Sequence, residues 1–237
     1  MAEPSESPGG PAWSDRAVLL VLTTVVAAMA WAMVRTGRAS LLEAVSFVTG
    51  AICVWLTVRA NVWNFPIGLV NTASFSVVFF EARLFGDAAL QGVYLVLGLV
   101  GWYLWLYGGE RRTALRVVRA SGGEKAAVAC MVVILTVVLW RTLHFAGGSA
   151  SFWDAATTSV SLGAQWLLNR KRLETWHLWI LVDIVYVPLY LSRGLNLTAL
   201  LYAVFLVMAV MGLSHWRSLV RESSPPLRAP WPEGLAG

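Results

Sequence analysis

The sequence has 237 residues, of which 58% are hydrophobic and only 13% are charged. Soluble domains contain about 45–50% apolar and about 25% charged residues, so this composition is that of a membrane protein. It excludes extracellular, collagenous, disordered and nucleic-acid-binding classes. The net charge of +5 reflects the topology of a protein with several spans rather than an acidic partner.

Apolar segments recur along the whole chain and are long enough to cross a bilayer. A transmembrane helix needs about 20 consecutive, mostly apolar residues. We predict eight such helices, at residues 17–34, 40–58, 62–80, 88–107, 126–142, 151–169, 175–192 and 196–215. Residues 1–16 and 217–237 are rich in Pro, Gly, Ser and charge, so we expect disordered tails there.

The first apolar segment has two interpretations. Residues 18–26 followed by Ala28-Met29-Ala30 have the form of a cleavable signal peptide. However, three acidic residues and one basic residue precede this segment, whereas a signal peptide begins with basic residues. We therefore expect a helix that is retained.

Lys and Arg are distributed unequally between the two sides of these helices. The N-terminus, the even-numbered loops and the C-terminal tail carry thirteen of them, and the opposite side carries five. Because cytoplasmic loops are enriched in Lys and Arg, both termini are predicted to be cytoplasmic.

The second half of the sequence repeats the first in a single register, in which each residue corresponds to the one 111 positions later. We call this displacement of 111 residues the repeat shift. The shift superposes Trp55 on Trp166, Arg59 on Arg170, Gly101 on Gly212 and Trp105 on Trp216, together with several Ala, Leu and Val pairs. It relates a first three-helix repeat, 40–107, to a second one, 151–216, and leaves 126–142 as a linker and 17–34 as an extra helix. Four helices separate equivalent elements, so both repeats cross the membrane in the same direction. Parallel repeats are one transporter architecture, with a substrate site near the midplane between the halves.

Asp183 is the charged residue of the segment 175–192 and lies ninth of its eighteen residues, near the midplane. A carboxylate there costs roughly 2.5–3.5 kcal/mol on insertion scales, so it needs a partner, a proton or a polar cavity. Trp176, Trp179, Tyr186 and Tyr190 share its helix face. Such a face binds a flat polar ligand by stacking and hydrogen bonding. The alternative is a packing face with a structural hydrogen bond, with Trp176 as an interface anchor.

Further polar residues lie inside the predicted helices. Asn64 and Asn71 share one face of 62–80, and Asn71 falls opposite Asp183 in the repeat if one residue of slack is allowed. Gln91 and Tyr94 begin 88–107, and Gln165 lies near the end of 151–169. These side chains are candidates for substrate binding, although polar residues also hydrogen-bond neighbouring membrane helices to each other.

The sequence lacks the usual signatures of enzymes and of ATP coupling. It contains no phosphate-binding Gly-rich loop, no HExxH and no GxSxG. His144, His177 and His215 are not clustered, and Cys53 and Cys130 have no metal-ligand spacing. We therefore expect no cofactor, no metal site and no enzymatic activity.

Several motifs together resemble the PnuC family of vitamin transporters over residues 40–217. They are NVWNFPIG at 61–68, FFEA at 79–82, DAALQ at 87–91, GWYLW at 101–105, SLGAQW at 161–166, WHLWILVD at 176–183, PLY at 188–190 and LY at 201–202. The WxxWxxxD element from Trp176 to Asp183 is the most specific of these motifs in its context.

The resemblance implies a SWEET-like arrangement of three plus one plus three helices in a bacterial inner membrane. It also implies nicotinamide riboside as the substrate, facilitated diffusion through the bilayer, and trapping by a cytoplasmic kinase that phosphorylates the riboside. By matching position, the first candidates for substrate contact are Trp179, Asp183, Gln91, Asn71 and Gln165. Five more residues complete the set: Trp176, Tyr186, Asn64, Tyr94 and Tyr202.

The sequence leaves alternatives open. Relatives that carry riboflavin or thiamine share much of the pattern, so the vitamin could be one of these. An intramembrane enzyme that uses Asp183 is disfavoured, because a single acid lacks a partner for general acid–base work. The oligomeric state, a homo-oligomer included, cannot be read, because lipid-facing and subunit-facing surfaces are both apolar.

Overall fold

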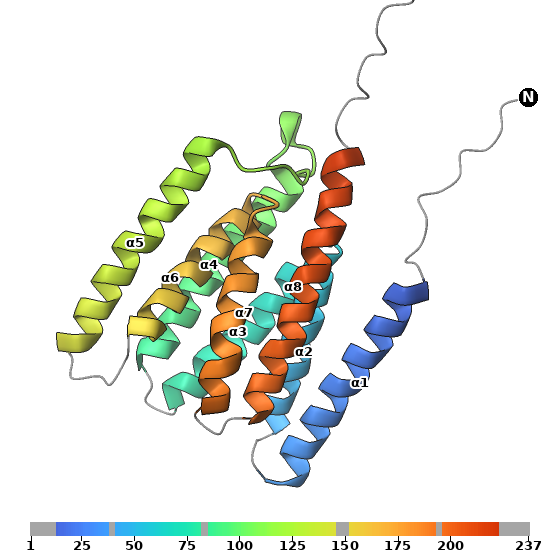
Figure 1. Ribbon diagram of the computed structural model, residues 1–237, viewed down its shortest axis with the longest axis vertical. Coiled ribbons are helices and arrows are strands. Elements are labelled where there is room, and N and C mark those ends of the chain that lie inside the picture. Colours follow the sequence, from blue (N-terminus) through green and yellow to red (C-terminus); the bar gives the residue numbers. More distant parts are fainter. Residues whose placement is uncertain (1–12, 38–40, 82–84, 146–151, 193–195, 223–237) are drawn as a thin grey trace, which may run out of the picture.

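The computed structural model describes residues 13–37, 41–81, 85–145, 152–192 and 196–222. In this part of the chain, eight α-helices lie side by side in one bundle (Figure 1). They are α1 (Trp13–Arg35), α2 (Leu41–Val58), α3 (Asn64–Glu81), α4 (Phe85–Tyr107), α5 (Gly122–Phe145), α6 (Phe152–Asn169), α7 (Thr175–Ser192) and α8 (Asn196–Glu222). A short 3-10 helix, η1 (Glu110–Arg112), follows α4.

The order and type of the helices agree with the sequence prediction, but two predicted tails were wrong at their inner ends. α1 begins at Trp13 and α8 continues to Glu222, so residues 13–16 and 217–222 are helical. The prediction ended each helix where its apolar run ended. Polar residues extend a helix beyond the apolar run when no Gly or Pro intervenes, and the first Pro after α8 is Pro225.

Four helices among the described residues are long and apolar enough to cross a membrane. They cover Ala89–Tyr107, Gly122–Thr142, Thr175–Ser192 and Ala199–Glu222, and shorter apolar helical stretches occur at Thr23–Ala32 and Val48–Val58. The chain is therefore an all-helical protein with several membrane-spanning candidates.

Two groups of three helices form the centre of the bundle. We call α2–α4 the first triplet and α6–α8 the second triplet, and within each triplet neighbouring helices pack against each other. The triplets meet where α2 packs on α8 and where α4 packs on α6. α5 packs mainly on α6, whereas α1 packs on α2 and α8, so these two helices lie at opposite edges of the bundle (Figure 1).

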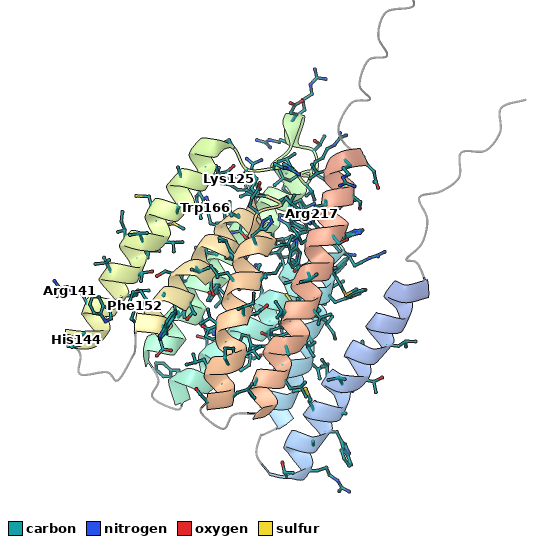
Figure 2. The ribbon with its side chains drawn as sticks, in the orientation of Figure 1. Lys125, Arg141, His144, Phe152, Trp166 and Arg217 are labelled. Carbon is teal, nitrogen blue, oxygen red and sulfur yellow. The ribbon has the colours of Figure 1, made fainter. Side chains whose placement is uncertain are left out.

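One end of the bundle holds the loops 59–63, 108–121 and 170–174 and the last turns of α8. We call it the basic end, because 108–121 and 170–174 alone contain seven of the 18 Lys and Arg residues. Figure 2 shows Lys125, Trp166 and Arg217 toward this end and Arg141, His144 and Phe152 toward the opposite end.

A cluster of four aromatic rings packs the interior near the basic end. Phe65, Trp105, Trp176 and Trp216 are all at most 4% exposed. Phe65 meets Trp105 edge to face at 5.0 Å, and Trp176 meets Trp216 edge to face at 5.4 Å. The repeat shift carries Phe65 onto Trp176 and Trp105 onto Trp216, so the same ring pair occurs once in each triplet.

Hydrogen bonds from two of these tryptophans cross between the triplets. Trp105 Nε1 of α4 donates to the carbonyl oxygen of Leu168 in α6 at 3.0 Å. Trp216 Nε1 of α8 donates to the carbonyl oxygen of Thr57 in α2 at 3.2 Å. The repeat shift also carries Thr57 onto Leu168, so each triplet donates to the equivalent carbonyl of the other.

The turns after α2 and α6 have the same structure. Each turn has a non-glycine residue in the left-handed region, Ala60 in one and Lys171 in the other, both with φ of 50°. The N–H of Ala60 donates to Thr57 and the N–H of Lys171 donates to Leu168, at 2.9 and 2.8 Å. The next N–H of each turn donates back to the residue before the acceptor, as in a Schellman cap.

The loop 108–121 is fixed onto the turn between α6 and α7. Val118 N–H donates to the carbonyl of Lys171 at 3.1 Å, within an isolated β-bridge to Arg172. Glu174 accepts from the backbone N–H of Ala120 at 2.7 Å and pairs with Lys125 at 2.9 Å. The loop 108–121 between α4 and α5 is therefore held by specific contacts to the second triplet and not only by chain continuity.

Candidate functional site

A cavity of about 410 Å³ lies between the two triplets. Its lining comes from α2, α3, α4, α6, α7 and α8, and no described residue of α1 or α5 belongs to it. Phe65 and Trp176 belong both to the lining and to the aromatic cluster, so the cluster bounds the cavity toward the basic end. The helices that line the cavity are the six that the repeat relates to each other.

The structure brings all ten sequence-predicted site residues together on this lining. They are Asn64 and Asn71 of α3, Gln91 and Tyr94 of α4, Gln165 of α6, Trp176, Trp179, Asp183 and Tyr186 of α7, and Tyr202 of α8. Their proximity satisfies the geometric condition for a common site. Their part in substrate binding stays a prediction.

Asp183 is the acidic residue of the lining. It is 4% exposed and lies midway along α7. Among the residues that the structure describes, no Lys or Arg forms an ion pair with it. A buried carboxylate without a basic partner favours a ligand that brings positive charge or a hydrogen-bond donor.

Aromatic rings surround this acid. Trp179 lies one helical turn before it on α7, and Tyr186 lies one turn after it. Tyr186 contacts Tyr202 of α8 at a ring-centre distance of 4.7 Å, and Tyr202 stacks on Tyr190 at 5.1 Å. The rings provide flat surfaces on which a heterocycle stacks, and electron-rich faces that attract a cation.

Two buried N–H groups on the lining have no hydrogen-bond partner in the described part of the chain. They are Nδ2 of Asn64 and Nε1 of Trp176, which are 3% and 2% exposed as residues. Unsatisfied buried donors are costly and are usually paired by water or a ligand. Asn71, in contrast, donates from Nδ2 to the Thr49 hydroxyl of α2 at 2.8 Å.

The chemistry of the lining is that of a binding site. No Lys or Arg is among its described residues, so it has no cationic group that would hold a phosphate. No group of three or more His, Cys, Asp or Glu side chains in the described residues is arranged to hold a metal ion. The lining therefore combines one acid, several amides and several aromatic rings, which are groups that suit a small polar, aromatic ligand.

Sequence reasoning missed other lining residues, and the repeat would have found two of them. The repeat shift, applied backwards to Gln165 and Trp176, gives Val54 and Phe65, and both line the cavity. Gly68, Leu69 and other small or apolar lining residues carry no chemical signal. Asn169 is not among the lining residues but accepts a hydrogen bond from Gln165; it was missed as well, because its polar side chain lies at a helix end.

Six helices around one cavity that is lined by both polar and apolar side chains, with several span-length apolar segments, are typical of a polytopic membrane transport protein. The chain belongs to the family described as nicotinamide mononucleotide transporters, which it matches over residues 40–218. The resemblance to PnuC proteins that the sequence motifs indicate is thereby confirmed.

Individual relatives agree with this family. The nicotinamide riboside transporter PnuC of Escherichia coli strain K12 is 25% identical over 209 residues, which cover 77% of this chain and 87% of the relative. The riboflavin/roseoflavin transporter RibM of Streptomyces davaonensis is 27% identical over 194 residues, covering 78% and 88%. A crystal structure of the vitamin B3 transporter PnuC superposes with a TM-score of 0.71 at 25% identity, covering 91% of this chain and 95% of that one. These relatives are transporters and not enzymes.

Proposed function

We propose that this protein takes up nicotinamide riboside across the bacterial inner membrane by facilitated diffusion. The observation that most strongly supports this proposal is the composition of the cavity lining. It has a buried acid without a basic partner, several aromatic rings and, among its described residues, no cation. Nicotinamide riboside is a flat pyridinium cation joined to a ribose. Its charge is complementary to Asp183, its ring to Trp179 and the tyrosines, and its hydroxyl and amide groups to Asn71, Gln91 and Gln165.

The same lining disfavours the phosphorylated form of this ligand. Phosphate groups are bound by Arg, Lys or clustered backbone N–H groups. The described lining offers Asp183 and no basic residue, so a mononucleotide would bring negative charge to a negative cavity. We therefore propose that the riboside crosses the membrane and that a cytoplasmic kinase then traps it by phosphorylation.

The proposed architecture is a 3+1+3 core of the SWEET-like kind, with α1 as an additional helix and all eight helices spanning the bilayer. The crossed tryptophan hydrogen bonds and the matching turns, which the repeat shift relates to each other, support two equivalent triplets. The positive-inside rule supports a cytoplasmic location of the basic end and of both termini. A reporter that is active only in the cytoplasm should be active when it is fused to the C-terminus, and a reporter that is active only in the periplasm should be inactive there. The opposite result would contradict this orientation.

The runner-up substrates are riboflavin and thiamine. The similarity to a riboflavin/roseoflavin transporter keeps riboflavin in consideration. Riboflavin is neutral, however, and leaves the Asp183 carboxylate without a charged partner. Thiamine is a cation like nicotinamide riboside, so charge alone does not separate these two.

Binding to the purified protein tests the substrate assignment. Isothermal titration calorimetry should detect binding of nicotinamide riboside, and at least tenfold weaker binding of nicotinamide mononucleotide, riboflavin and thiamine. Tighter binding of the mononucleotide would contradict the charge argument. Tighter binding of riboflavin or thiamine would replace the substrate but leave the transporter assignment in place.

A further inference from the structure

Two amide side chains on α6 mark a difference between the triplets. Gln165 lines the cavity, and Asn169, one helical turn further on, is 2% exposed. The equivalent positions in the first triplet are Val54, which also lines the cavity, and Val58, which is also 2% exposed. The fold therefore packs two valines in α2 where α6 has two amides, so helix packing alone does not require the amides.

The hydrogen bonds of Asn169 determine which way its amide faces. Its Nδ2 donates to the backbone carbonyl of Leu97 in α4 at 2.8 Å. A backbone carbonyl only accepts hydrogen bonds, so this contact requires the NH₂ group of Asn169 to face α4. The oxygen of Asn169 consequently faces Gln165. Gly101 leaves room for this arrangement, because a Cβ at position 101 would overlap Asn169 Oδ1.

The orientation of Asn169 in turn determines that of Gln165. Gln165 Nε2 donates to Asn169 Oδ1 at 3.0 Å. An amide oxygen accepts and does not donate, so the nitrogen of Gln165 has to face Asn169. The oxygen Oε1 of Gln165 is then left for the cavity, and no described residue donates a hydrogen bond to it.

We infer that Asn169 is a positioning residue that locks the Gln165 amide, so that the cavity meets the substrate at this point with an acceptor oxygen. The substrate group bound there is a hydrogen-bond donor, either an amide N–H or a hydroxyl. This inference deepens the proposed function and rests on it for the identity of the substrate. Nicotinamide riboside offers donors of both kinds, in its carboxamide and in its ribose.

A double-mutant cycle on the purified full chain tests this coupling. The variants are Gln165→Val, Asn169→Val and their combination, which copy the valines that α2 carries at the equivalent positions. Gln165→Val should weaken binding of nicotinamide riboside about 3- to 10-fold, the effect of one hydrogen bond. Asn169→Val should weaken binding by a similar or smaller factor, and it should have no further effect once Gln165 is already valine.

The cycle separates positioning from a merely structural role. If Asn169 only tethers α6 to α4, its substitution will weaken binding by the same factor in both backgrounds, and that result would overturn the inference. Unchanged affinity of Asn169→Val in the presence of Gln165 would overturn it as well. Ser159→Ala is the matched control on α6, because Ser159 is buried, donates to the carbonyl of Ala155 in its own helix and is not among the described lining residues.

Two further outcomes are distinguishable. If the wild-type protein binds riboflavin or thiamine in place of nicotinamide riboside, the substrate assignment fails, and the same cycle is measured with the ligand that binds. Binding of none of the three contradicts both proposals. If Asn169→Val does not purify as a monodisperse protein, Asn169→Ala replaces it in the cycle.

Discussion

At the scale of single residues, Asp183 determines the charge of the cavity. The substitution Asp183→Asn keeps the shape and removes the charge, so binding of nicotinamide riboside should weaken about 10-fold or more, as expected for a lost charged hydrogen bond or ion pair. Thermal stability should be unchanged or higher, because a carboxylate without a basic partner no longer has to be buried. Calorimetry and thermal melting of the purified variant measure the two effects.

The neighbouring residue provides the control for this variant. Ile184 is 53% exposed and does not line the cavity, so Ile184→Ala should leave the affinity unchanged. If wild-type and Asp183→Asn protein bind nicotinamide riboside with equal affinity, Asp183 has only a packing role.

Gly101 is a second residue to consider singly, because the packing between the triplets depends on it. A Cβ at this position would lie 2.5 Å from Phe65 Cε1 and would overlap Asn169 Oδ1. Gly101→Ala should therefore destabilise the protein by about 1–3 kcal/mol through overpacking. Gly92→Ala on the same helix should not, because nothing lies within 4 Å of its added Cβ. The melting temperatures of the two variants measure this difference. Equal values would show that α4 shifts to accommodate the added Cβ at position 101.

At the scale of the elements, the crossed tryptophan hydrogen bonds connect the triplets at the basic end. Trp105→Phe and Trp216→Phe each keep an aromatic ring and remove one N–H donor. Each should lower stability by about 0.5–1.5 kcal/mol for the lost hydrogen bond, and by a further amount for the space that the smaller ring leaves in a buried site. The two effects should be similar, since both bonds join equivalent positions. Trp63→Phe is the control, because Trp63 is 63% exposed, and a melting temperature as low as that of the other two would contradict the argument.

The loop 108–121, which joins α4 to α5, depends on Glu174. Burial alone would raise the pKa of Glu174, but the N–H of Ala120 and the charge and hydrogen bond of Lys125 outweigh it and hold the pKa below its usual value. A carboxyl whose folded pKa is lowered stabilises the fold above its unfolded pKa, and this contribution is lost as the pH falls through the folded value. Glu174→Gln should therefore cost about 1 kcal/mol at pH 7, discounted for partial solvent exposure.

The pH dependence tests this assignment. The difference in melting temperature between wild-type and Glu174→Gln protein should be about 2–4 °C at pH 7 and should shrink toward pH 3. Glu110→Gln is the control, because Glu110 is exposed and no described Lys or Arg forms an ion pair with it. A difference that is independent of pH would show that the Glu174 carboxylate charge contributes nothing.

At the scale of the whole molecule, the sequence predicted the helices and ten residues of the cavity lining better than the contacts between them. Segments without charged residues indicate where the helices lie, because the bilayer and the interior of the bundle are both apolar. The deficit of polar groups makes Asp183, Gln91 and Gln165 conspicuous, and all three line the cavity. The orienting role of Asn169 could not be foreseen, because it depends on the carbonyl of Leu97, 72 residues away.

The repeat predicts which residues are equivalent but not which residues they contact. Trp105 and Trp216 were recognised as a pair, but their hydrogen bonds cross to the opposite triplet, and a shift along the sequence does not say which triplet a side chain contacts. The helical ends at Trp13 and Glu222 were missed because polar residues form helices without leaving a hydropathy signal.

Transport by facilitated diffusion is measured as uptake of labelled nicotinamide riboside into proteoliposomes. We expect saturable uptake that proceeds down the substrate gradient, needs no ATP and persists when proton and sodium gradients are dissipated. Uptake should fall in Asp183→Asn proteoliposomes at low substrate concentration and be unchanged in Ile184→Ala. Absence of saturable uptake, or uptake that is abolished when an ion gradient is dissipated, would contradict transport of this riboside by facilitated diffusion.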